Sequence, residues 1–169
     1  MYDLEAYTKK FEELTTAGDL DGAEQFILNE LPAIDMQYYL GGGGCPSCRS
    51  QEKEDLEAAE WLRERITAQT ILRNDLIRLY HVAGRWDDCM AVFDQLMVNL
   101  EDAGLLEAPL HGRILLNRAM LEQELGRFDA ALADAEHAKA CLETAPEIAP
   151  DALRQANETI DACKASLGK

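Results

Sequence analysis

The sequence predicts an all-α protein, built as an array of antiparallel helix hairpins. Three segments resemble one another: each has a glycine, a polar residue, a large apolar residue and an aspartate, and then a small residue five positions after the glycine. Gly84, Gly126 and Gly168 recur at a constant interval of 42, and the interval from Gly18 to Gly84 is 66. A fixed period of this size indicates a repeat array. Apolar residues recur every three or four positions, as in amphipathic helices, and not at every second position, as in strands.

The N-terminal part is predicted to hold a degenerate first repeat, residues 1–31, followed by an insertion, residues 32–66. The first interval between glycines is longer than the later ones, and the insertion accounts for this excess. It contains the glycine- and cysteine-rich stretch YYLGGGGCPSCRSQ. Nothing breaks a helix from Ser50 to Ala83, so this segment forms either one long helix or two.

Two better repeats follow, residues 67–110 and 111–149. In each, a first helix ends at a glycine, which permits the sharp turn at a helix end. An aspartate then lies in the first turn of the second helix, where its charge suits the positive end of the helix dipole. The residues that repeat along the apolar faces of these helices are Leu72, Leu76, Leu79, Trp86, Cys89, Phe93, Leu115, Ala119, Phe128, Ala131 and Ala135.

The last segment, residues 150–169, is predicted to be a capping helix. Pro150 suits a first helical turn. Leu153, Ala156, Ile160 and Cys163 lie on one side, and the other side is polar. A terminal unit with a polar outer face is what a repeat array requires.

These residues resemble the tetratricopeptide repeat family. Tyr80, Gly84, Trp86 and Phe93 match one copy of the pattern, and the second copy is matched by Ala119, Gly126, Phe128, Ala131 and Ala138. The usual period of the family is about 34 residues. The longer period here resembles the 42-residue, kinesin-light-chain-like variant. The resemblance implies a single domain, residues 1–169, that is a right-handed superhelical α-solenoid.

The composition limits the partners. The chain has 169 residues and a formal net charge of −16, which opposes binding to nucleic acid or to an anionic membrane surface. A basic partner, or one with an apolar helix face, fits better. Neither a secretory leader nor a run of about 18 apolar residues is visible, so we expect a cytoplasmic protein that does not enter a membrane.

Cys45 and Cys48 follow four consecutive glycines and raise the question of reactive chemistry. A Cys-Pro-x-Cys pair can serve redox chemistry or a disulfide, or supply half of a zinc site that His137 and Cys141 would complete. We expect instead a mobile loop with reduced thiols, because consecutive glycines resist a rigid site. The sequence also has no phosphate-binding loop and no arrangement for nucleophilic catalysis. It therefore predicts no enzyme, no cofactor and no bound metal.

In this family the first helices of successive repeats line a concave groove that holds the ligand. The resemblance places seven residues there: Asn74, Arg78, His81, Arg113, Asn117, Met120 and Gln123. It implies a non-catalytic scaffold, chaperone or adaptor that binds a protein or peptide. Two alternatives remain open: a zinc- or thiol-dependent protein that uses Cys45 and Cys48, and a homo-oligomeric structural protein, such as a homodimer paired through the long helix.

Overall fold

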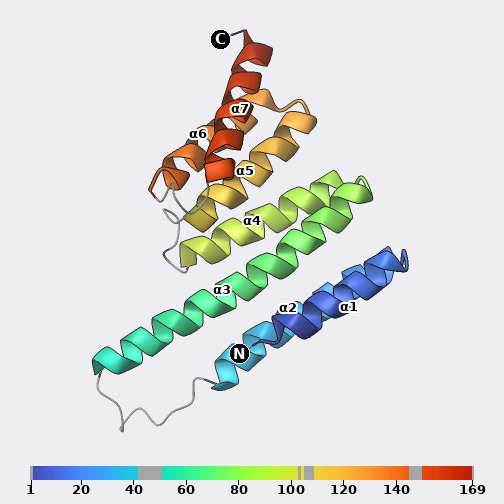
Figure 1. Cartoon of the computed structure of the whole chain (residues 1–169), viewed down its shortest axis with the longest axis vertical. Coiled ribbons are helices and arrows are strands. Elements are labelled where there is room, and N and C mark those ends of the chain that lie inside the picture. The colour runs from blue at the N-terminus through green and yellow to red at the C-terminus, as the bar shows by residue number, and fades with distance from the viewer. Residues whose placement is uncertain (1, 42–50, 103, 105–108, 145–149, 169) are drawn as a thin grey trace. The chain divides into compact units, whose positions relative to one another are not determined.

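The computed structural model describes residues 2–41, 51–102, 104, 109–144 and 150–168, and the side chains of 37–41, 51–59 and 102 are not described. The described residues form seven helices and contain no strand (Figure 1). Helices that follow one another in the chain pack as antiparallel pairs. The predicted all-α class is confirmed.

The chain divides into two compact units, Met1–Val92 and Phe93–Lys169. The first unit holds α1 (Leu4–Thr16), α2 (Leu20–Gly41), α3 (Gln51–Val82) and the start of α4 (Trp86–Asp102). The second unit holds the rest of α4, then α5 (Pro109–Glu124), α6 (Phe128–Leu142) and α7 (Pro150–Leu167). The single domain and its repeat boundaries stay predictions.

In the first unit, α2 continues past residue 31 and includes Pro32 in its interior. A proline there removes a backbone hydrogen bond and crowds the preceding turn, at a cost of about 3 kcal/mol. Ile34, two positions after the proline, is fully buried, so tertiary packing favours continuation of the helix. Gly41, the first of the four glycines, is the last residue of α2.

Helix α3 settles the choice between one long helix and two. It is one continuous helix of 32 residues, about 48 Å long at the usual rise per residue. Leu72, Leu76 and Leu79 are buried along it, as the spacing predicts.

In the second unit, α5, α6 and α7 enclose small and branched side chains. One buried cluster is Leu115, Leu116, Ala138, Leu142 and Ala156, and a second is Ala119, Ala131, Leu132, Ala135, Ile160 and Cys163. The alanines of α6 bring its backbone close to both neighbours. Predicted packing positions of α5, α6 and α7 thus form the core.

The same turn recurs after α1, α3 and α5. Gly18, Gly84 and Gly126 have φ values of 75°, 68° and 71°, a region that other residues rarely adopt. After each glycine, the next N–H donates to the carbonyl five residues earlier: Asp19 to Leu14, Arg85 to Tyr80 and Arg127 to Glu122. The small residues near the start of the following helices, Ala23, Cys89 and Ala131, are all fully buried. The repeated sequence pattern therefore corresponds to a repeated local structure.

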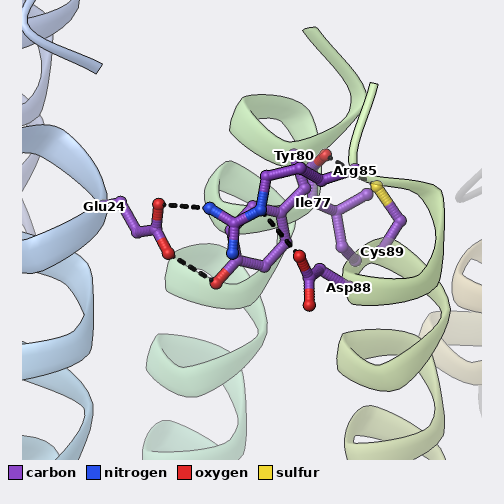
Figure 2. A network of polar contacts seen from close by, with 6 residues as sticks. All are labelled: Glu24, Ile77, Tyr80, Arg85, Asp88 and Cys89. Carbon is purple, nitrogen blue, oxygen red and sulfur yellow. Dashed lines mark hydrogen bonds and ion pairs between the residues drawn. The ribbon is translucent and has the colours of Figure 1, made fainter. Parts of the chain in front are cut away.

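A polar network holds the second of these turns to α2 (Figure 2). The Glu24 carboxylate accepts hydrogen bonds from Arg85 at 2.6 Å and from the Tyr80 hydroxyl at 3.0 Å. Arg85 also donates to Asp88 at 2.6 Å, and the Cys89 thiol donates to the Ile77 carbonyl at 3.5 Å. The turn is thus fixed by side chains from α2, α3 and α4.

Among the described residues, no helix combines the length and the apolar character needed to cross a membrane.

Candidate functional site

The predicted binding residues of the first unit lie on α3. Arg78 and His81 are exposed, and Asn74 is half-buried. Arg78 pairs with Asp75 at 3.3 Å, and Asp75 also accepts a hydrogen bond from the Tyr7 hydroxyl at 3.1 Å. Burial raises the pKa of Asp75 above its ordinary value. The Arg78 side chain nevertheless remains 76% exposed, so it stays accessible to a partner.

His81 already makes a contact within the protein. Its ring meets the ring of Trp86 edge to face, with centroids 5.1 Å apart. Contacts of this kind favour one ring orientation. His81 is therefore a less adaptable binding residue than Arg78.

Two exposed apolar side chains accompany Arg78 on α3. Ile71 precedes it by seven positions and Val82 follows it by four, which places all three on one face of the helix. Val82 is 73% exposed. The sequence pattern does not single out Val82, because this residue lies at the glycine turn, where the helical periodicity ends.

The predicted binding residues of the second unit form a line on α5. Arg113, Asn117 and Met120 are spaced by four and three positions and are all exposed, while Gln123 is half-buried. The opposite side of α5 carries the buried Leu115. Helix α5 thus separates a packed side from an exposed side that combines a cation, an amide and a thioether.

Beside this line, Arg118 is held within the protein. Its Nε and Nη2 atoms donate to the two carboxylate oxygens of Asp134 on α6, at 2.5 and 2.9 Å. These hydrogen bonds raise the pKa of Arg118. Glu122, one turn further along α5, is buried, and one of its oxygens has no hydrogen-bond partner among the described groups. Burial, and next the charge of Asp134, raise the pKa of the Glu122 carboxyl.

The second helices also expose some apolar side chains. Leu28 and Met36 on α2 and Val98 on α4 are exposed. Packing therefore does not use all the apolar residues of these helices, although it does use Cys89 and Phe93 on α4.

The cysteines separate into two groups. Cys45 and Cys48, the candidate thiol or zinc pair, lie outside the described residues. Cys89 and Cys163 are buried core residues, as their positions in the pattern predict, and burial raises the pKa of both thiols. A thiol that stays protonated is a poor nucleophile.

Cys141 has a different setting, which the sequence only half predicts. It lies one turn after His137 on α6, as expected, and His111 on α5 joins them. The sequence alone does not place His111 beside His137 and Cys141, because His111 lies far from both of them along the chain.

Comparison with known proteins leaves the family open. No protein-family model matches the chain, and no curated protein or solved structure shows a significant match. The likeness to tetratricopeptide repeats therefore rests on the sequence pattern alone.

Proposed function

We propose that this protein is a non-catalytic module of the tetratricopeptide repeat type, which binds a protein or peptide through the exposed sides of its first helices. The observation that carries the proposal is the exposed line of Arg113, Asn117 and Met120 on α5. In the proposed right-handed superhelical array, this line would be part of the concave face.

The chemistry of this line suits a peptide or a helix of another protein. Met120 is an unbranched, polarisable side chain that adapts to differently shaped apolar partners. Asn117 can both donate and accept, so it can pair with a peptide backbone. Arg113 can make charge-assisted hydrogen bonds to carbonyl or carboxylate oxygens. An apolar helix face in such a setting is recognised through anchors spaced by three and four residues.

The charge of the chain favours a basic partner. A net charge of −16 speeds the encounter with a cationic protein and repels polyanions. It supports the view that the partner is neither nucleic acid nor an anionic membrane.

Exposed apolar residues on α2 favour a second candidate, a homo-oligomeric structural protein. Leu28 and Met36 could be covered by another copy of the chain. A measurement of mass in solution separates this candidate from a monomeric binding module.

The proposal is tested by quantitative pull-down from the native host. Three baits are compared: the wild type, a double variant and a control. The double variant carries Arg78→Ala on the exposed face of α3 and Met120→Ala on the exposed face of α5. The matched control carries Met36→Ala and Arg127→Ala, which remove an exposed methionine and an exposed arginine elsewhere. We expect a partner that the wild-type and control baits retain and the first variant loses. A partner that only the control loses would instead support a binding surface that includes Met36 or Arg127.

A further inference from the structure

Three side chains of the kinds that ligate transition metals lie together in the second unit. His111 lies near the start of α5, and His137 and Cys141 lie one turn apart near the end of α6. One ring nitrogen from each histidine and the Sγ atom of Cys141 all lie within 4.8 Å of one another. We infer that His111, His137 and Cys141 form a binding site for a divalent metal ion of the zinc class.

The fold itself brings these residues together. Helices α5 and α6 are an antiparallel pair around the turn at Gly126, and residues equally distant from such a turn lie opposite each other. His111 precedes Gly126 and Cys141 follows it at the same distance along the sequence. His137 is one helical turn before Cys141 and shares its face of α6. The site thus requires only the hairpin, which is a well-packed part of the unit.

A glycine allows the two helices to approach closely at this point. Gly112 is buried next to His111. A Cβ atom at this position would lie 2.9 Å from the Ala138 carbonyl oxygen and 3.0 Å from the Cβ of Cys141. A glycine inside a helix costs about 1 kcal/mol relative to alanine. Here it shortens the distance between the helix that carries His111 and the helix that carries Cys141.

The distances are close to those of a metal site. In a tetrahedral zinc site, with Zn–N and Zn–S bonds of about 2.0 and 2.3 Å, neighbouring ligand atoms are about 3.3–3.6 Å apart. Cys141 Sγ lies 3.7 Å from His111 Nδ1, which is close to that spacing. The rings of His111 and His137 are 5.0 Å apart between centroids and nearly perpendicular, at 87°.

The burial of the three residues suits a site that an ion can enter. His111 is 1% and Cys141 4% exposed, so two ligands are fixed within the packed hairpin. His137 is exposed, so it provides the entry side. Water can take the fourth position there, as in zinc sites with three protein ligands.

The ligand types select the metal. Imidazole and thiolate suit zinc, whereas magnesium and calcium prefer oxygen ligands. On binding, the Cys141 thiol loses its proton to solvent, and the S–Zn bond replaces the S–H bond. This site is independent of the proposed partner-binding face, and it does not use Cys45 or Cys48.

The test is a metal titration of the whole 169-residue chain. Protein freed of metal by chelator is titrated with zinc chloride against a chromophoric chelator. A second titration uses cobalt chloride, because a thiolate ligand gives cobalt(II) a charge-transfer absorption band. Both are performed on a Cys45→Ser/Cys48→Ser background, which removes the other candidate pair. We expect binding of about one ion per chain with the thiolate band present.

Substitutions then assign the site. His137→Ala should weaken zinc binding by about tenfold or more, since loss of a residue that only hydrogen-bonds to a metal ligand already has an effect of that size. His137 is exposed, so this variant should retain the fold. The matched control is His81→Ala, which removes the remaining histidine of the chain and should leave the zinc affinity unchanged. Cys141→Ser should remove the cobalt band, whereas Cys163→Ser, at another buried cysteine, should retain it.

Three results would overturn the inference. One is the absence of zinc binding on the Cys45→Ser/Cys48→Ser background, which would leave Cys141 and His111 as a buried contact only. Another is a zinc affinity that His137→Ala does not change. The third is a cobalt(II) complex without the thiolate charge-transfer band, which would exclude Cys141 as a ligand.

Discussion

The guanidinium carbon of Arg85 lies 4.2 Å from the centre of the Tyr80 ring, and both side chains donate hydrogen bonds to the carboxylate of Glu24. Tyr80 lies in the last turn of the first helix of a hairpin, and Arg85 follows the glycine of its turn. The carboxylate on α2 therefore joins both sides of one turn (Figure 2). This relationship makes the turn a stabilising element and not only a connection.

The hydroxyl of Tyr80 gives the first prediction. Tyr80→Phe should lower the free energy of unfolding by about 1.5–3 kcal/mol, the usual net value of a hydrogen bond to a charged group. Chemical denaturation monitored by circular dichroism measures this change. Tyr2→Phe, which removes another tyrosine–glutamate hydrogen bond, is the matched comparison and should have an effect of similar size. An unchanged stability in Tyr80→Phe would show that the bond to Glu24 contributes nothing.

Tyr80 also predicts a dependence on alkaline pH. Burial, and next the hydrogen bond to Glu24, raise the pKa of Tyr80 to about 12 from the ordinary value of 10.0. The folded state holds the Tyr80 proton more tightly than the unfolded state does. The protonated hydroxyl therefore contributes its full stabilisation below pH 10, and this stabilisation is lost as the pH rises toward 12. The wild type should therefore lose more stability than Tyr80→Phe between these two pH values. Equal losses would show that Tyr80 has an ordinary pKa.

The repeated turn is tested at Gly126. Its φ of 71° strains any residue with a Cβ, although no atom lies within 4 Å of the added carbon. Gly126→Ala should destabilise the protein by about 1–2 kcal/mol. Gly126→Asn should cost less, because asparagine tolerates this backbone conformation better. The denaturant midpoints of the two variants separate backbone strain from steric collision. Backbone strain predicts the higher midpoint for Gly126→Asn, and steric collision predicts it for Gly126→Ala, whose side chain is smaller.

The packing of α4 is tested at Phe93, which is fully buried. Phe93→Ala should lower the free energy of unfolding by about 3–5 kcal/mol, since it leaves a cavity as well as removing apolar contacts. Val98→Ala, on the same helix but exposed, should change it by no more than about 0.5 kcal/mol. A similar small effect at both positions would mean that Phe93 is not a core residue.

The buried carboxyl of Glu122 predicts a dependence on acidic pH. Its pKa is raised, so the folded state favours the protonated form, and the resulting stability is lost as the pH rises above the ordinary value of 4.5. Glu122→Gln, which stays neutral, should be more stable than the wild type at pH 7 by on the order of 1 kcal/mol. The difference should vanish near pH 4.5. Glu124→Gln, which removes an exposed carboxylate from the same helix, serves as the matched control.

The features that depend on short-range sequence patterns could be predicted. The glycine turns require a backbone conformation that few residues adopt, so Gly18, Gly84 and Gly126 mark them directly. The small residue five positions later, such as Cys89, reveals where two helices come close. The all-α class follows from helical periodicity without alternation.

Other features could not be predicted because tertiary contacts decide them. Pro32 indicates a helix end by local preference, but the burial of Ile34 keeps α2 continuous. The contact of His111 with Cys141 joins residues far apart in the sequence and becomes visible only when positions are paired across the Gly126 turn. The exposure of Val82 depends on which neighbours pack against α3.

The central claim, that the exposed side of the first helices binds a partner, is tested most directly by site-specific photo-cross-linking. A photoreactive amino acid is placed at Asn117 on α5 or, as a control, at Ala133 on α6; both positions are exposed. The two proteins are irradiated in the native host, and the cross-linked products are identified by mass spectrometry. We predict one recurrent protein partner joined at position 117 and not at position 133. A partner joined only at position 133, or joined equally at both positions, would contradict it.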